Sequence, residues 1–180
     1  MRVIAGIARG HPLVAPRDRA TRPITDRVKE TLFAILGARV PGARVLDLYA
    51  GSGAIGLEAL SRGAEHATFV EHARSALAAL RENLDRTRLG EMATVEASDV
   101  ERFLARPPAE LWDLVFLDPP YDLHAIVAPL LAVEPHLAPD AMLVVKHFWR
   151  TDLPPVAGIE PVRQRRFGET MLSCLEAPGR

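Results

Sequence analysis

The most constraining feature of the sequence is a regular alternation of short apolar runs and helix-like stretches that begins near residue 44. The apolar runs at 44–50, 67–71, 93–98, 111–118 and 141–148 are predicted strands, and the stretches at 54–63, 73–87, 100–106 and about 123–137 are predicted helices. Such alternation is typical of a doubly wound α/β sheet with parallel strands. The run LWDLVFLD at 111–118 is almost continuously apolar, which favours a strand buried on both faces.

The two ends of the chain do not follow this alternation. The first 17 residues predict a small hairpin or arm that turns near Gly10–His11–Pro12, and residues 24–36 predict an amphipathic helix capped by Thr25 or Asp26. The segments on either side of Gly168 predict a closing antiparallel pair of strands. We therefore expect an N-terminal arm and helix, residues 1–42, packed on a single α/β domain formed by residues 43–180.

Length and composition limit the class of protein. A chain of 180 residues fits one domain with a sizeable core. No stretch approaches the roughly 20 apolar residues of a membrane span, and the N-terminus lacks the apolar run of a secretory signal. Cys174 is the only cysteine, which excludes an internal disulfide and a multi-cysteine metal site. We expect a cytoplasmic monomer with no membrane contact and no metal.

Positive charge is concentrated in two places, although the formal net charge is only −1. Residues 1–30 hold seven basic side chains against three acidic ones; the basic residues are Arg2, Arg9, Arg17, Arg19, Arg22, Arg27 and Lys29. A second cluster near the C-terminus consists of Arg163, Arg165 and Arg166. Local positive patches neutralise phosphates, so both clusters are candidate RNA contacts. A solvated basic surface without a partner is the alternative.

A glycine-rich loop follows the first predicted strand. The segment from Asp47 to Gly56 contains Gly51-Ser52-Gly53 and has the pattern G-x-G-x-x-G between a strand and a helix. Glycines let the backbone turn tightly and approach a ligand closely, and the following helix offers unpaired amides. The pattern predicts a nucleotide-type cofactor and fits a dinucleotide as well as another adenosyl cofactor.

Acidic residues follow the next two predicted strands. Glu71 lies 20 residues after Gly51, where a carboxylate can accept hydrogen bonds from ribose hydroxyls. Asp99 can accept a hydrogen bond from an adenine amino group, and it can also cap the helix that begins at Val100. Together with the loop, these acids predict an adenosyl pocket at the carboxyl ends of the strands.

The fourth predicted strand ends in Asp118-Pro119-Pro120-Tyr121. The Asp118 carboxylate and the Pro119 carbonyl can accept hydrogen bonds from an exocyclic amine of a base and stabilise positive charge that develops on its nitrogen. The prolines restrict the backbone, and Tyr121 offers a face on which an unstacked base can lie. This tetrapeptide predicts chemistry on a nucleobase amine. A dehydrogenase would have no use for it, so the tetrapeptide argues against that class of enzyme.

Several motifs occur in the same order and at similar spacing in a known family. RPITDRVKETLFAIL, DLYAGSGAIGLEALSRGA, the acidic end of FVEHA and FLDPPY resemble the RsmD family of bacterial 16S rRNA guanine-N2 methyltransferases. The resemblance covers essentially the whole chain. It implies a Rossmann-like class I methyltransferase fold with a seven-stranded mixed sheet whose last strand is antiparallel. It also implies S-adenosylmethionine as the methyl donor and a guanine of the small ribosomal subunit, or of an assembly intermediate, as the acceptor.

The resemblance also assigns roles to residues. The implied cofactor-binding residues are Asp47, Gly51, Ser52, Gly53, Glu71, Asp99, Val100 and Asp118, and the implied catalytic residues are Asp118, Pro119, Pro120 and Tyr121. Thr25, Asp26 and Arg27 either approach the site or only cap their helix. Lys146 stands where many relatives are expected to carry an acid, so it receives no catalytic role, and His72 is expected to border the pocket.

Three other functions stay open at this stage. An adenine-N6 methyltransferase acting on DNA or RNA would also use a DPPY-type site, although the chain has no obvious segment for DNA target recognition. An NAD-dependent oxidoreductase would share the glycine loop. A non-catalytic RNA-binding or assembly factor would retain the pocket without its chemistry.

Overall fold

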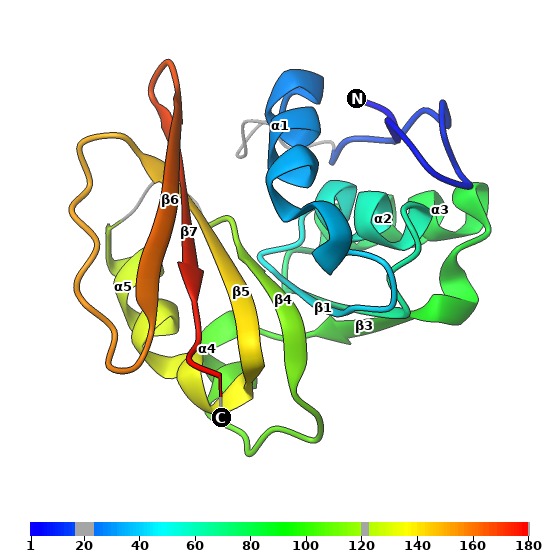
Figure 1. Cartoon of the computed structure of the whole chain (residues 1–180). Helices are drawn as coiled ribbons and strands as arrows, with labels where there is room; N and C mark the ends of the chain where they lie inside the picture. Colours follow the sequence, from blue (N-terminus) through cyan, green and yellow to red (C-terminus); the bar gives the residue numbers. More distant parts are fainter. Residues whose placement is uncertain (17–23, 120–122, 180) are drawn as a thin grey trace.

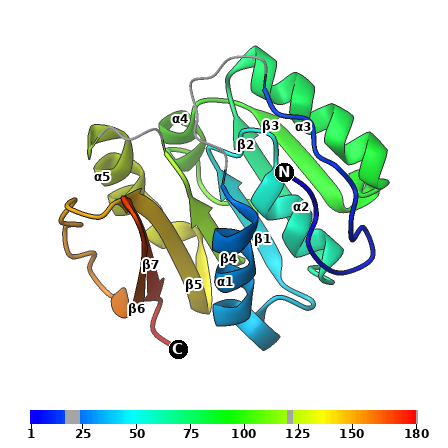
Figure 2. The ribbon, with the colours of Figure 1, turned by 90° about the horizontal axis from the view of Figure 1, so that it is seen from above.

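The structure is a computed structural model that describes residues 1–16, 24–119 and 123–179. Within these ranges, seven strands form one sheet in the order β3-β2-β1-β4-β5-β7-β6 (Figures 1 and 2). Strands β1 to β5 pair in parallel, whereas β7 is antiparallel to both of its neighbours, β5 and β6. The predicted α/β fold, with a mixed seven-stranded sheet closed by an antiparallel strand, is confirmed.

The elements have the following bounds. The strands are β1 (Arg44–Leu48), β2 (His66–Glu71), β3 (Ala93–Ala97), β4 (Trp112–Leu117), β5 (Leu137–Phe148), β6 (Glu160–Phe167) and β7 (Thr170–Glu176). The helices are α1 (Asp26–Leu36), α2 (Ala54–Ser61), α3 (Arg74–Thr87), α4 (Val100–Leu104) and α5 (Leu123–Ala132). Short 3-10 turns follow α1, precede β3 and precede β5. No described helix has both the length and the apolar character needed to cross a membrane.

Helices cover both faces of the sheet. Helices α1, α2 and α3 pack on one face and α4 and α5 on the other (Figure 2). Side chains of β4 alternate between the two cores, with Phe116 in the first and Val115 and Leu117 in the second. Since successive residues of a strand point to opposite faces, an apolar run such as β4 contributes to both cores at once.

Three predicted boundaries need correction. Strand β5 begins at Leu137 and not at 141, and α5 ends at Ala132, followed by a 3-10 turn that contains Pro135. The N-terminal arm turns over residues 5–10, earlier than the turn predicted near Gly10–His11–Pro12. Arg2 and Pro12, on either side of this turn, form an isolated antiparallel β-bridge. Gly6 explains the early turn: its φ is +84°, and a Cβ there would lie 1.6 Å from the Ser61 carbonyl oxygen of α2. Only glycine lets the arm pass this close.

The arm is fastened to the helices by the buried carboxylate of Glu58 on α2. Its oxygens accept hydrogen bonds from the amides of Ile4 (2.7 Å) and Ala5 (3.0 Å) and from Arg62 Nε (2.7 Å). Lys29 Nζ of α1 lies 3.1 Å away, and neither the Lys29 nor the Glu58 side chain is exposed. This packing supports our proposal that residues 1–42 form an appendage on the α/β domain.

Glu58→Gln should destabilise the protein by about 3–5 kcal/mol, because it leaves the buried Lys29 charge uncompensated. Urea unfolding monitored by circular dichroism measures the change. Glu82→Gln is the matched control: Glu82 pairs with Arg86 at 3.6 Å on the exposed side of α3, and its loss should cost under about 0.5 kcal/mol. Equal effects of the two substitutions would contradict the role given to Glu58.

Candidate active site

The carboxyl ends of β1, β2 and β4 meet at one edge of the sheet. The amide of Ala50, just after β1, donates to the Val70 carbonyl of β2 (3.1 Å), and the amide of Asp118 donates to the Leu48 carbonyl of β1 (3.4 Å). Asp47 interacts electrostatically with both Glu71 and Asp118. The loop, Asp47, Glu71 and Asp118 are therefore brought together at the carboxyl ends of the strands, where doubly wound sheets bind their ligands.

The glycines of the loop have different tasks. Gly51 and Gly53 have φ values of +57° and +78°, which glycine adopts without strain. A Cβ on Gly56 would lie 2.3 Å from the buried Phe69 ring, so this glycine lets α2 pack closely on β2. Around Gly51, by contrast, the nearest atom to such a Cβ is the Tyr49 carbonyl oxygen at 4.0 Å. Gly51 is thus the glycine with open space beside it.

Glu71 organises the loop from the end of β2. Its carboxylate accepts hydrogen bonds from the amides of Gly51 (2.9 Å), His72 (2.8 Å) and Ala73 (2.7 Å). The residue is only 8% exposed, so it is not a solvated acid at a strand end. A carboxylate has about four acceptor positions, and three amides leave capacity for a ligand hydroxyl.

Asp47 lies beneath the loop and is 1% exposed. Its Oδ2 accepts a hydrogen bond from the Gly56 amide (3.0 Å). Burial raises the pKa of Asp47 to about 8; the Gly56 hydrogen bond lowers it, and the charges of Asp118 and Glu71 raise it. Asp47 is therefore protonated near neutral pH, and its role there is to support the loop from below.

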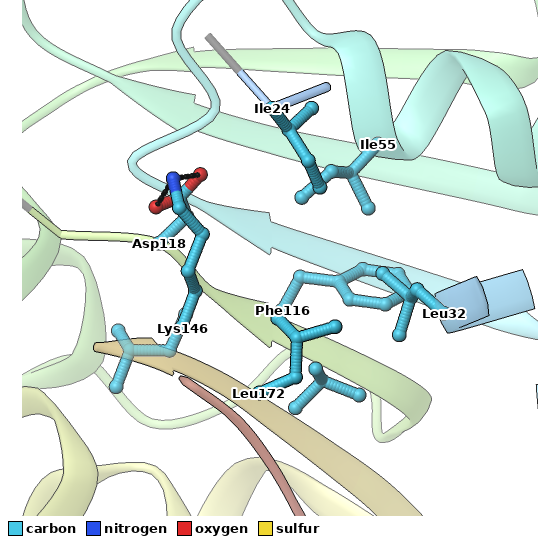
Figure 3. Close-up of a pocket in the computed structure, with 9 residues that line it drawn as sticks. Ile24, Leu32, Ile55, Phe116, Asp118, Lys146 and Leu172 are labelled. Carbon is cyan, nitrogen blue, oxygen red and sulfur yellow. Dashed lines mark hydrogen bonds and ion pairs between the residues drawn. The ribbon is translucent and has the colours of Figure 1, made fainter. Parts of the chain in front are cut away.

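Asp118 forms an ion pair with a lysine that the sequence analysis left without a role. Lys146 Nζ lies 2.5 Å from Oδ1 and 2.8 Å from Oδ2 of Asp118 (Figure 3). The exposed fractions of the two side chains are 10% for Lys146 and 22% for Asp118. Burial raises the pKa of the Asp118 carboxyl, and the Lys146 charge and hydrogen bond oppose that rise.

An apolar wall closes the site beside this ion pair. The pocket next to Asp118 and Lys146 is lined by apolar residues from the segment before α1, from α1, α2, β4, β5 and β7, among them Ile24, Leu32, Ile55, Phe116 and Leu172 (Figure 3). Such a wall keeps water away from the ion pair and strengthens its electrostatic interaction.

Three of the predicted residues have contacts within the fold. Asp99 caps α4, because its Oδ1 accepts hydrogen bonds from the amides of Glu101 (2.9 Å) and Arg102 (3.3 Å). The side chain of Val100 is 1% exposed and belongs to the core beneath α4. Thr25 caps α1 by accepting from the Val28 amide (3.4 Å), which confirms the capping prediction.

The predicted basic contacts are only partly described. Arg17, Arg19, Arg22, Pro120 and Tyr121 lie outside the described residues. Arg9 and Arg27 are exposed, whereas Arg2 pairs with Asp26 at 3.3 Å. Arg163, Arg165 and Arg166 are exposed on β6, and the Arg166 guanidinium lies 3.7 Å from the centre of the Trp149 ring. Among the described residues, no three acidic, histidine or cysteine side chains gather as metal ligands.

Comparison with known proteins gives consistent matches. Residues 1–176 match the family described as "Conserved hypothetical protein 95". The chain is 39% identical to "Ribosomal RNA small subunit methyltransferase D" of Escherichia coli (strain K12), over 87% of this chain and 79% of that protein. The chain belongs to the RsmD family.

Two further relatives of the family cover nearly the full length. "Putative rRNA methyltransferase YlbH" of Bacillus subtilis (strain 168) is 37% identical over 99% of this chain and 100% of its own. The solved structure of "Putative methyltransferase yhhF from Escherichia coli" has a TM-score of 0.90 and 34% identity, and covers 100% of this chain and 99% of its own. These matches confirm the predicted Rossmann-like methyltransferase fold and the predicted family.

Two residues of the site received no role in the sequence analysis. Lys146 interrupts the apolar run AMLVVKHF, and a charge within a buried strand is a signal that an opposite charge lies nearby. Asn83 of α3 donates to the Ser52 carbonyl (2.9 Å) and so supports the glycine loop. No local pattern marks Asn83, since its partner lies 31 residues away in the chain.

The raised pKa of Asp47 predicts a pH-dependent stability. The folded protein keeps a proton between pH 3.8 and about 8 that the unfolded chain releases, so the contribution of Asp47 to stability is full below pH 3.8 and is lost as the pH rises toward 8. Asp47→Asn keeps an acceptor for Gly56 and does not titrate. Its free energy of unfolding relative to wild type should therefore rise between pH 4 and 8 and then level off.

Urea unfolding at each pH from 4 to about 9, which passes the Asp47 pKa of about 8, measures this difference. Asp113→Asn is the control, since Asp113 on β4 accepts from the Arg44 amide (2.8 Å) at an exposed position. A pH-independent difference for Asp47→Asn would refute the assignment of a protonated Asp47.

Proposed function

We propose that the chain transfers a methyl group from S-adenosylmethionine to the exocyclic N2 amine of a guanine in 16S rRNA. The observation that carries the proposal is the position of Asp118 and Pro119 at the end of β4, beside the loop that Gly51 and Glu71 form. The names of the relatives from E. coli and B. subtilis support an rRNA substrate.

The site fits the proposed cofactor. The open space at Gly51 suits close approach of the methionine portion, and the remaining acceptor capacity of Glu71 suits the ribose hydroxyls. We assign the adenine contact to Asp99 and the loop contacts to Ser52 and Gly53. When bound, S-adenosylmethionine supplies an electrophilic methyl group, and its positive charge suits an edge that carries the negative Glu71 and Asp118.

The residues of the chain then act by positioning and by charge. The Asp118 carboxylate and the Pro119 carbonyl accept hydrogen bonds from the amine and hold its lone pair toward the methyl group. The negative charge of Asp118 stabilises the positive charge that develops on nitrogen. We assign to Tyr121 the stacking of the base and to Pro120 the restriction of the backbone.

We assign the RNA backbone contact to exposed arginines. Arg9 and Arg27 lie near the N-terminus, and Arg163 and Arg165 lie on the edge strand β6. Phosphate contacts of this kind position an RNA without reading its sequence. They account for affinity, whereas the pocket beside Asp118 accounts for the choice of a base amine.

The function is tested by methyl transfer to small ribosomal subunits and to naked 16S rRNA from a strain without the gene. Nucleoside mass spectrometry identifies the product: N2-methylguanosine supports the proposal, and N6-methyladenosine would replace it with the adenine alternative. Calorimetry with S-adenosylhomocysteine and with NAD separates the methyltransferase from an oxidoreductase. Cofactor binding without any product on RNA or DNA would favour a non-catalytic assembly factor.

Asp118→Ala should lower the rate of methyl transfer by about 10²–10³-fold, because it removes the charge that stabilises the transition state. Its affinity for S-adenosylhomocysteine should stay within about threefold of wild type, a difference well below 1.4 kcal/mol. Asp113→Ala, the same substitution near the other end of β4, is the matched control and should keep full activity. Full activity of Asp118→Ala would refute the mechanism.

A further inference from the structure

The sheet register places Lys146 beside Asp118. Strands β4 and β5 pair in parallel, with Leu117 opposite Val145, so the next residue of each strand is Asp118 and Lys146. Lys146 is also opposite Leu172 of β7, which holds the β5 backbone from its other side. The backbone of Lys146 is therefore held between two neighbouring strands, and this places the root of its side chain beside Asp118.

The contact engages both carboxylate oxygens. Lys146 Nζ is 2.5 Å from Oδ1 and 2.8 Å from Oδ2, which fixes the plane of the carboxylate as well as its charge. Each oxygen of a carboxylate has about two acceptor positions. The exocyclic amine of the acceptor base can therefore still donate a hydrogen bond to Asp118 while the Lys146 ammonium stays bound.

The surroundings give Asp118 no second source of positive charge among the described residues that line the pocket. The other residues that line this pocket are apolar; they include Ile24 before α1, Ile55 of α2 and Leu172 of β7 (Figure 3). Asp118 also interacts electrostatically with Asp47 of β1, which is protonated near neutral pH and supplies no positive charge. Burial raises the pKa of the Asp118 carboxyl, and among the described residues the Lys146 charge and hydrogen bond oppose that rise.

We propose that Lys146 is a positioning residue for methyl transfer: its ammonium keeps the Asp118 carboxylate ionised and oriented toward the acceptor amine. This inference rests on the proposed function. A protonated Asp118 would donate a hydrogen bond from one oxygen and carry no charge to stabilise the methylated nitrogen. The same lysine would be dispensable if the ion pair only joined two strands.

The test compares three substitutions at Lys146 with a control. Lys146→Met removes the charge and keeps the length, Lys146→Gln keeps a donor without charge, and Lys146→Arg keeps the charge. Arg44→Met is the control, because Arg44 pairs with Glu110 at 2.5 Å at the amino end of β1, away from the site. Circular dichroism checks that each variant folds, and Lys146→Gln replaces Lys146→Met if the apolar variant does not.

The first measurement is kcat at saturating S-adenosylmethionine between about pH 5.5 and 7, a range in which Asp47 stays mostly protonated because its pKa is about 8. Lys146→Met should lose at least about tenfold in kcat at pH 6, and the loss should shrink as the pH rises, because each unit of pKa shift is a tenfold change in the ionised fraction. Affinity for S-adenosylhomocysteine should not change. Lys146→Arg should recover most of the activity, and Arg44→Met should match wild type.

The second measurement does not need the reaction. The ¹³Cγ resonance of Asp118, assigned by its absence in Asp118→Asn, is titrated in the cofactor-free protein. Its midpoint should move to higher pH in Lys146→Met and Lys146→Gln and return toward wild type in Lys146→Arg.

The outcomes separate the two proposals. A uniform loss of kcat at every pH, unchanged activity, or an unmoved ¹³Cγ midpoint in Lys146→Met would each overturn the role of Lys146. Absence of methyl transfer by the wild-type protein would overturn the proposed function, while the carboxyl titration would still decide whether Lys146 holds the charge of Asp118.

Discussion

The buried carboxylate of Glu58 is the contact on which the N-terminal part of the structure depends. It is shared by the arm, through the amides of Ile4 and Ala5, by α1, through Lys29, and by α2, on which it lies. Two oxygens satisfy four donors, so the cost of burying the acid is offset by a complete set of partners. This contact fixes α1 over the sheet, and Leu32 of α1 together with Ile24 then forms the apolar wall beside Asp118.

The site shows three ways of burying an acid at one edge of a sheet. Asp47 stays protonated because burial raises its pKa, whereas Glu71 accepts hydrogen bonds from three backbone amides. Asp118 is paired with an ammonium. Of these three acids, Asp118 is the one that the structure pairs with a cationic side chain. We assign the chemistry to Asp118 because it lies at the end of β4 beside Pro119, and the support of the loop to the other two acids because they accept from its amides.

Sequence patterns predicted the elements well and their long-range contacts poorly. The apolar runs gave β1 to β4 within two residues, because buried parallel strands are short and apolar. The start of β5 was missed because Pro139 and Asp140 interrupt its apolar character. The Gly6 turn depends on its distance to Ser61, and the Lys146–Asp118 pair depends on strand order. Neither is encoded by residues that are neighbours in the chain.

Asn83 joins the two regions to which we assign different parts of the function. Its Oδ1 accepts from the Val14 amide (2.7 Å), and its Nδ2 donates to the carbonyls of Val14 (3.0 Å) and Ser52 (2.9 Å). One buried amide therefore holds the end of the arm and the glycine loop at a fixed separation. Because Glu58 fixes the beginning of the same arm, Arg9 lies on a segment tied at both ends. A phosphate bound there would be positioned relative to the loop, which is what methyl transfer to one chosen base requires.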